Sequence, residues 1–137
     1  LKNIKILCHD QRDLLFANST GLPYVYTSDV YEYLSLLKSA ALVVSMRVHA
    51  TLPCLSLGTP VINISYDERS KSLLKTIGYS DWDVNLIESN NIMNDISERL
   101  SSLDALKHLK TQSENLQLWQ ELYNIQEEAI LTLKIGK

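Results

Sequence analysis

Short apolar runs alternate along this sequence with segments of helical spacing, and this alternation limits the possible folds more than any other feature. The runs at 4–8, 24–26, 41–45 and 61–65 indicate strands. Between them, leucine, isoleucine and tyrosine recur every three to four residues, which indicates helices. Strands that alternate with helices of this length pair in parallel through right-handed crossovers. The sequence therefore predicts an α/β fold, with a parallel sheet flanked by helices.

Proline and glycine indicate where the helix after the 41–45 run begins and ends. Proline is tolerated in the first turn of a helix and costs roughly 3 kcal/mol further in. Pro53 therefore predicts a helix that begins near Ala50. Gly58 stands where a left-handed C-cap ends that helix, and Gly78 has the same position after the next one.

The length of 137 residues is that of one ordinary α/β domain, so a single domain is expected over 1–137. Residues 91–137 have helical spacing with a break at Ser101 and Ser102, and we expect them to form a helical tail that packs on the sheet. The sequence opens on Leu1 rather than methionine, which leads us to expect a fragment of a longer protein.

Charge and composition exclude several functions. The formal net charge of −3 gives no general attraction to nucleic acid. No apolar run approaches the roughly 20 residues of a membrane-spanning helix, so no transmembrane segment is expected. The three histidines and two cysteines lack metal-ligand spacing, and there is no glycine-rich phosphate loop. Cys8 and Cys54 are expected to be reduced, which favours the cytoplasm, with the inner face of the membrane as an alternative location.

Three polar loops follow predicted strands, at the edge where open α/β sheets bind their ligands. The candidate site residues in these loops are His9, Asp10, Arg47, His49, Tyr66, Asp67, Arg69 and Lys71. Because the loops leave the same edge of a parallel sheet, we expect their side chains to converge on one electropositive crevice.

Arg47 and His49 lie between a buried strand and the start of a helix. Backbone N–H groups and the helix dipole favour a phosphate or carboxylate at such a position. A guanidinium adds a bidentate clamp, and a histidine can donate a proton at neutral pH. These two residues therefore predict a small-anion site.

A purely structural interpretation stays open for each loop. Arg47 could pair with Asp67 or Asp10 to brace the strand ends, while His49 caps the helix or packs in the crevice. His9 and Asp10 could form a hydrogen-bonded loop pair. Tyr66 and Asp67 could bind a substrate hydroxyl or merely begin a turn.

The motifs SMRVHA at 45–50, GTP at 58–60 and YD at 66–67, with a strand at 61–65, resemble the C-terminal signature of polysaccharide pyruvyl transferases. The family pattern is S-x-R-L-H-A, G-x-P, a strand, then Y-D-x-K. The pair His9-Asp10 is also similar to a family motif, and the resemblance spans residues 4–78. Val48 replaces the usual leucine. Arg69 stands near the usual lysine with Lys71 close by, so both stay candidates for that position.

The resemblance implies a Rossmann-like domain, one half of a GT-B-like fold whose N-terminal domain is missing here. It implies an enzyme of exopolysaccharide biosynthesis that transfers a pyruvyl group from phosphoenolpyruvate to hydroxyls of a glycan or lipid-linked sugar. This chain would be the donor-binding half, inactive alone, with no cofactor and no metal. Arg47 would hold the donor's carboxylate or phosphate, and His49 would contact the phosphate or supply a proton.

Two alternatives belong to other classes of protein. The chain could be the nucleotide-sugar-binding domain of a GT-B glycosyltransferase or epimerase, with Asp67 or Glu68 holding ribose hydroxyls. It could also be a non-catalytic binding module of a polysaccharide operon.

Overall fold

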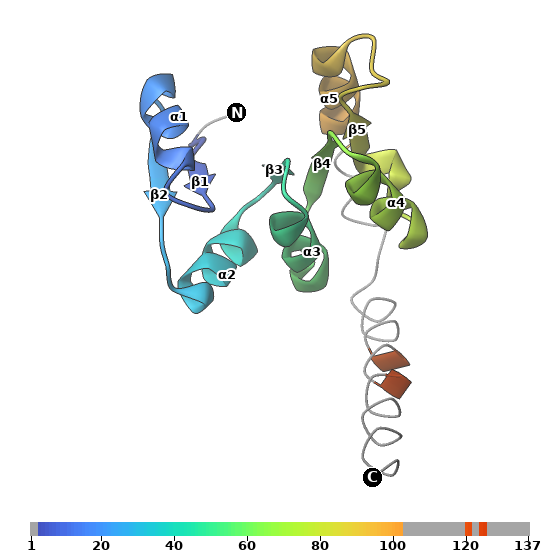
Figure 1. Cartoon of the computed structure of the whole chain (residues 1–137), viewed down its shortest axis with the longest axis horizontal. Helices are drawn as coiled ribbons and strands as arrows, with labels where there is room; N and C mark the ends of the chain where they lie inside the picture. The colour runs from blue at the N-terminus through green and yellow to red at the C-terminus, as the bar shows by residue number, and fades with distance from the viewer. Residues whose placement is uncertain (1–2, 103–119, 122–123, 126–137) are drawn as a thin grey trace. The chain divides into compact units, whose positions relative to one another are not determined.

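A computed structural model of the chain describes residues 3–102, 120–121 and 124–125. They belong to two compact units, one ending at Leu37 and the other beginning at Lys38, and each unit is described by itself (Figure 1). The expectation of one domain over 1–137 stays a prediction. Most of the expected tail, including residues 103–119, lies outside the described residues.

The first unit has a short two-stranded sheet with a helix after each strand. Its elements are β1 (Ile6–Cys8), α1 (Asp13–Thr20), β2 (Tyr24–Tyr26) and α2 (Val30–Ser39), the last of which crosses the boundary between the units. The two strands are parallel, and Leu7 pairs with Val25. Asp29 caps α2, because its Oδ1 accepts the N–H of Tyr31 at 2.7 Å and that of Glu32 at 3.1 Å.

The second unit is a three-stranded parallel sheet with its helices between and after the strands. Its elements are β3 (Val43–Ser45), α3 (Val48–Leu57), β4 (Val61–Ser65), α4 (Glu68–Thr76), a 3-10 turn η1 (Ser80–Trp82), β5 (Asp83–Asn85) and α5 (Ile92–Ser101). The strand order is β3-β4-β5, so β4 is central. Val43 pairs with Val61, and Asn63 pairs with Asp83.

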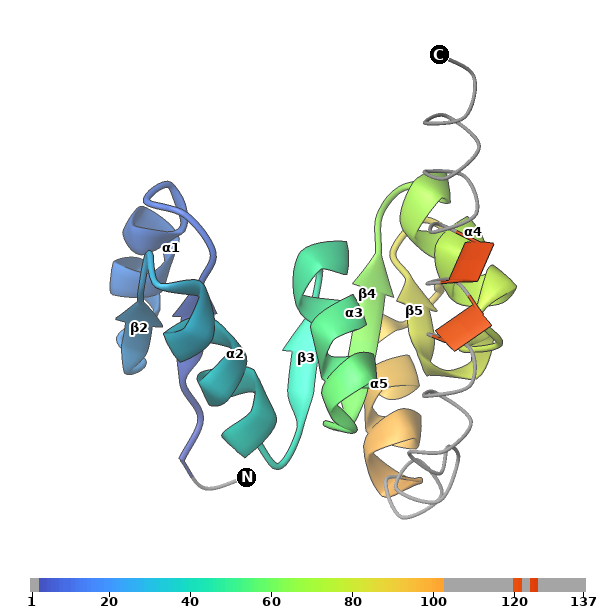
Figure 2. The same cartoon turned by 90° about the horizontal axis from the view of Figure 1, so that it is seen from below.

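Helices α3 and α4 cover the same face of this sheet. Thr51 of α3 and Ser70 of α4 both hydrogen-bond the side chain of Asn63 on β4, so both helices lie on the side to which Asn63 points. Right-handed crossovers through three strands in sequential order require this arrangement. Figure 2 shows α3 in front of β3 and β4. The neighbouring Ile62 points to the opposite face and is fully buried.

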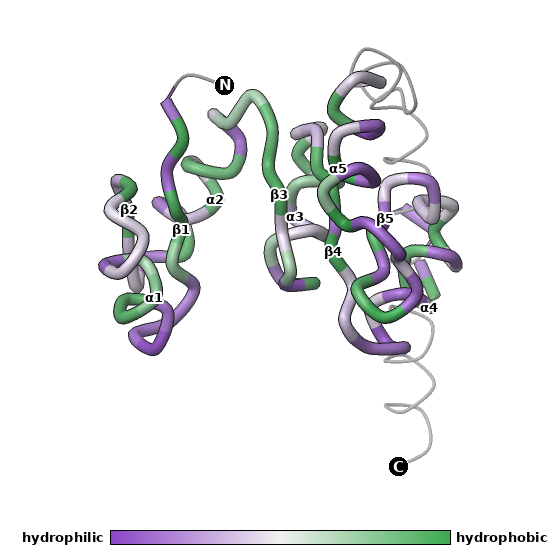
Figure 3. The backbone as a smooth tube through the Cα atoms, turned by 90° about the horizontal axis from the view of Figure 1, so that it is seen from above, coloured by the Kyte–Doolittle hydropathy of each residue, from purple (hydrophilic) through white to green (hydrophobic). Residues whose placement is uncertain are grey.

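Apolar burial is concentrated on the central strand. Val61 and Ile62 are buried on β4, with Val84 beside them on β5 and Cys54 on α3. Figure 3 shows hydrophobic residues along β3 and hydrophilic ones along much of α4. The core therefore lies between the sheet and its helices, and the strand ends that carry the polar loops are left at its margin.

The α/β class and the parallel pairing are confirmed, and the chain is Rossmann-like, with parallel strands flanked by helices. The strands at 24–26 and 61–65 have the expected bounds. Gly58 and Gly78 have φ of 71° and 73°, the left-handed conformation that their positions predict. Among the described residues the strands form two sheets, so one sheet through both units stays a prediction.

The predicted start of the helix after β3 is wrong by two residues. Helix α3 begins at Val48, not near Ala50, and Pro53 is its sixth residue. The proline lacks an N–H for the carbonyl of His49, four residues earlier, so the helix loses one hydrogen bond near its middle. A single proline therefore limits where a helix can start without fixing it. None of the helices in the described part of the chain is long and apolar enough to cross a membrane.

Candidate functional site

The junction between β3 and α3 holds the backbone of Arg47 in a defined conformation. Arg47 is the N-cap of α3, with extended φ and ψ of −119° and 122°. The Ser45 hydroxyl accepts the N–H of Arg47 and donates to its carbonyl, both at 3.0 Å. The N–H groups of Ala50 and Thr51 donate to the same carbonyl at 2.9 and 3.0 Å. The main chain of residue 47 is therefore fixed from both sides.

The N-terminus of α3 keeps the electrostatic properties that favour an anion. It has no side-chain cap and no acidic residue in its first turn. Arg47 is half-buried and His49 is exposed, while Ala50 is buried and anchors the turn. His49 was expected in the loop, but it is the second residue of the helix. An exposed histidine therefore stands beside an arginine at the N-terminus of a helix whose first turn holds no acidic residue.

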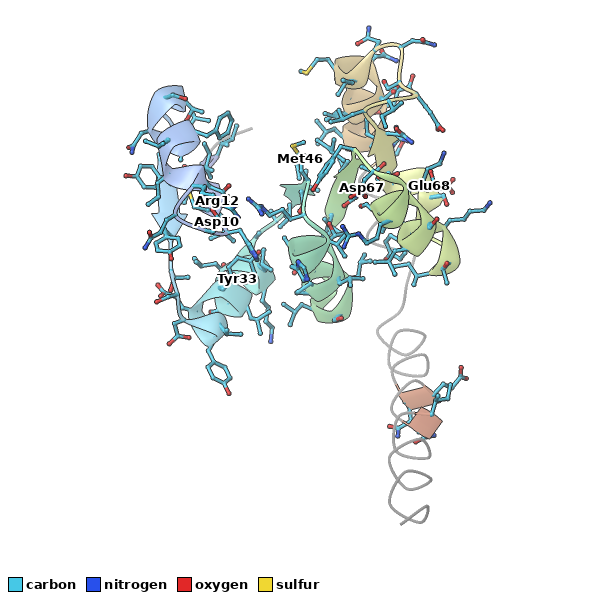
Figure 4. The ribbon with its side chains drawn as sticks, viewed as in Figure 1. Asp10, Arg12, Tyr33, Met46, Asp67 and Glu68 are labelled. Atoms are coloured by element: carbon cyan, nitrogen blue, oxygen red, sulfur yellow. The ribbon has the colours of Figure 1, made fainter. Side chains whose placement is uncertain are left out.

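The N-terminus of α4 is different because it already holds a carboxylate. Asp67 is its N-cap, and Oδ1 accepts the N–H of Ser70 at 2.9 Å. Glu68 adds a second acidic residue in the first turn. Figure 4 shows both side chains at the start of α4, with Met46 at the end of β3. Of the two helix ends after β3 and β4, that of α3 is the better site for an anion.

Arg69 and Lys71 have unequal surroundings, which bears on the position that the sequence leaves open. The Arg69 side chain is 88% exposed, and its Nη2 lies 4.0 Å from Oδ2 of Asp67. The Nζ of Lys71 lies 2.5 Å from Oε1 of Glu88, and this hydrogen bond raises the pKa of Lys71. Arg69 is therefore the more accessible cation of the pair.

Sequence reasoning missed Glu88, because it missed the strand that places it. Glu88 follows β5, and the side chain of Asn85 at the end of that strand accepts the N–H groups of Ile87 and Glu88. Tyr66, after β4, is half-exposed. The carboxyl ends of all three strands of this unit therefore carry polar or aromatic side chains that a ligand can reach.

The loop after β1, in the first unit, is held by its own carboxylates. Oδ2 of Asp13 accepts the N–H groups of His9 at 2.8 Å and of Asp10 at 3.2 Å. Asp10 forms an ion pair with Arg12 at 2.8 Å. The rings of His9 and Tyr33 form a T-shaped pair with centroids 5.9 Å apart, and Figure 4 shows Asp10, Arg12 and Tyr33. Asp10 thus organises its loop together with Arg12, and a hydrogen-bonded pair of His9 with Asp10 stays a prediction.

The predicted convergence of the loops can be followed only within each unit. In the second unit, residues 45–49 and 66–71 leave neighbouring parallel strands at the same edge. His9 and Asp10 belong to the first unit, so their place in a shared crevice stays a prediction. Among residues 3–102, 120–121 and 124–125, no group of three or more histidine, cysteine, aspartate or glutamate side chains could hold a metal ion.

The fold and the residues at the strand ends define the chain as a Rossmann-like α/β protein with polar residues at the carboxyl ends of its strands. The family model of polysaccharide pyruvyl transferase matches residues 3–68, just under half of the chain. The matched stretch contains β1 to β4 and includes both Arg47 and His49. Over this stretch the chain is similar to the polysaccharide pyruvyl transferase family. Neither the curated proteins nor the solved structures compared with it give a match.

Proposed function

We propose that the chain binds phosphoenolpyruvate at the N-terminus of α3 and supports transfer of its pyruvyl group to sugar hydroxyls. One observation carries this proposal. Arg47 and His49 stand at a helix N-terminus that has neither a side-chain cap nor an acidic residue, within the residues that match the family.

Phosphoenolpyruvate suits this position because it carries two anionic groups, a carboxylate and a phosphate. The guanidinium of Arg47 can hold either in a bidentate manner. The helix dipole favours the same charge. Arg69, exposed at the next strand end, is the candidate for the second anionic group, since Lys71 already pairs with Glu88.

The proposed reaction forms a ketal. The methylene carbon of the donor gains a proton, and a sugar hydroxyl adds to the neighbouring carbon and loses its own proton. The bond from that carbon to the phosphate oxygen then breaks and inorganic phosphate leaves. A second sugar hydroxyl adds to the same carbon, and its proton goes to the departing phosphate. His49 either supplies the first proton or contacts the leaving phosphate, because histidine can serve both tasks near neutral pH. The proposed scheme uses no metal and no organic cofactor.

The remaining parts of the site belong to the same proposal. Tyr66 is half-exposed beside the donor position and is the candidate to contact the sugar acceptor, a glycan or lipid-linked sugar. His9 and Asp10 would extend the donor site from the loop after β1. A second GT-B-like domain would complete the acceptor side, in the cytoplasm or at the inner face of the membrane.

A nucleotide-sugar-binding domain would need an acidic residue available for ribose hydroxyls. Asp67 is engaged as the cap of α4, and Oε1 of Glu68 accepts the Ser72 hydroxyl at 3.4 Å. These contacts favour phosphoenolpyruvate over a nucleotide sugar. The same contacts do not distinguish an enzyme from a non-catalytic binding module, so that choice depends on an activity assay.

The test is a phosphate-release assay on the full-length enzyme with phosphoenolpyruvate and a set of glycan acceptors, and with mass spectrometry of the product. We expect phosphate release that requires the acceptor, and a product that gains the mass of a pyruvyl ketal. Parallel samples contain a nucleotide sugar in place of phosphoenolpyruvate. Turnover or tight binding of the nucleotide sugar alone would refute the proposal. Binding of phosphoenolpyruvate without turnover on any acceptor would support the binding module.

A further inference from the structure

A chain of buried polar side chains runs beneath the two helix N-termini of the second unit. Its members are Thr51 on α3, Asn63 and Ser65 on β4, Ser70 on α4 and Asp83 on β5. The first four are between 0% and 3% exposed. They lie on the face of the sheet that α3 and α4 cover, where Val61 of the same strand is apolar.

Asn63 is the centre of this chain because its amide bonds three different elements. Its Oδ1 lies 2.7 Å from the hydroxyl of Thr51. Its Nδ2 donates to the Ser70 hydroxyl at 3.2 Å and to Oδ1 of Asp83 at 2.7 Å. Oδ2 of Asp83 in turn accepts the hydroxyl of Ser65 at 2.6 Å. Asp83 therefore fixes which way the amide of Asn63 points.

The chain of bonds reaches both strand-helix junctions of the proposed site. The hydroxyl of Thr51 lies 3.2 Å from the carbonyl oxygen of Arg47 and 2.7 Å from Oδ1 of Asn63, so it contacts both residues. On the other side, the N–H of Ser70 donates to Asp67, the cap of α4. The side chain of Asn63 thus connects the backbone of Arg47, through Thr51, to Ser70 in the first turn of α4. The same turn carries Arg69.

Stability alone gives little reason for these residues. Burying an amide or hydroxyl costs free energy that its hydrogen bonds only offset, whereas an apolar side chain gains from burial. A satisfied polar network does hold its partners in one arrangement, because any shift leaves a buried group without a bond. The network is therefore suited to fixing the positions of the two helix ends.

We propose that Asn63, oriented by Asp83, is a positioning residue for the anion site, holding Arg47 at the end of α3 in register with Arg69 at the start of α4. This inference rests on the proposed function. It adds two residues that touch no ligand and that lie outside the polar loops of the strand ends.

The test exchanges Asn63 and Asp83, the two residues of the central hydrogen bond. Asn63→Asp alone places two carboxylates against each other and breaks the network. Asn63→Asp combined with Asp83→Asn puts the carboxylate on β4 and the amide on β5, so a donor again faces an acceptor while the hydroxyls of Thr51 and Ser70 can both donate to the carboxylate. Ile62→Val is the matched control, because it disturbs the adjacent position of the same strand on the opposite face.

The measurements are the dissociation constant of phosphoenolpyruvate by calorimetry, well below the melting temperature, and the melting temperature itself. We expect Asn63→Asp to weaken binding about tenfold and the exchanged pair to restore it to within about threefold, as expected for directly coupled residues. Ile62→Val should lower the melting temperature without changing the dissociation constant.

The outcomes separate this inference from the proposed function. If phosphoenolpyruvate binds the wild type and needs Arg47, while Asn63→Asp binds it equally well, the network is only structural and the positioning role is refuted. The same holds if the exchanged pair folds like the wild type but binds no better than Asn63→Asp. If the wild type binds no phosphoenolpyruvate, the proposed function fails first. If Asn63→Asp does not fold, the exchanged pair alone decides. Binding like that of the wild type supports the positioning role, and weaker binding by a folded exchanged pair refutes it.

Discussion

Replacing Arg47 with alanine separates the ligand contacts of this residue from its structural ones. The bonds of Ser45, Ala50 and Thr51 to residue 47 are made with its main chain, which alanine retains. Arginine is not among the residues that cap helices well, so little capping energy is lost. A substitution of this kind changes the free energy of unfolding by about 0.5 kcal/mol. The melting temperature should therefore move by roughly 1–4 °C.

The expected loss of affinity is much larger. A hydrogen bond to a charged group contributes about 1.5–3 kcal/mol. At about 1.4 kcal/mol for each factor of ten, Arg47→Ala should weaken phosphoenolpyruvate binding roughly 10- to 150-fold. Arg47→Lys keeps the charge but loses the bidentate fork, so its affinity should lie between those of the wild type and the alanine variant.

Isothermal titration calorimetry with phosphoenolpyruvate, run beside thermal melts, measures both effects. Lys75→Ala is the charge-matched control, because Lys75 is exposed in the last turn of α4, away from the strand ends. Normal melting of Arg47→Ala with unchanged affinity would refute the anion site. Loss of folding in both Arg47 variants would show that this side chain is a structural brace.

Three further predictions concern other parts of the chain. Gly58→Ala should destabilise the protein by about 1 kcal/mol in urea unfolding, because φ is 71° and no atom lies within 4 Å of the added Cβ, so the cost is conformational and Gly58→Asn should cost less. Arg69→Ala should weaken phosphoenolpyruvate binding, whereas Lys71→Ala should not, and equal losses of affinity in the two variants would contradict this difference. In Glu88→Gln the pKa of Lys71 should fall towards its ordinary value in an NMR titration. Burial raises the pKa of Cys54 to about 12, so iodoacetamide at pH 8 should leave it unmodified until denaturant is added, and rapid alkylation of the native thiol would show that it is accessible.

Residue patterns along the chain are enough to predict strands β1 to β4 and the helix ends at Gly58 and Gly78, because these depend on residues close together in the chain. The runs at 24–26 and 61–65, for example, predict β2 and β4 with their observed bounds. Gly58 and Gly78 end α3 and α4 through their left-handed backbone conformation. The position of Arg47 at a strand-helix junction follows from the same kind of information.

The third strand of the second unit could not be found from the sequence. Strand β5 has three residues, of which only Val84 is apolar, so it lacks the apolar run that indicates a strand. Pairing with β4 makes it one, since Asp83 bonds Asn63 across the sheet. Because β5 was missed, Glu88 and its bond to Lys71 were missed as well.

Tertiary structure also decided what each polar residue of the loops does. Asp67 and Arg69 are adjacent to other charged residues in the sequence, and nothing local distinguishes a helix cap from a ligand contact. The fold turned Asp67 towards the N–H of Ser70 and left Arg69 exposed. It also joined Thr51, Asn63 and Ser70, because residues distant in the chain meet only when α3 and α4 pack on one face of the sheet. Local sequence thus determines which elements form, whereas burial and pairing between them decide which polar groups remain available for chemistry.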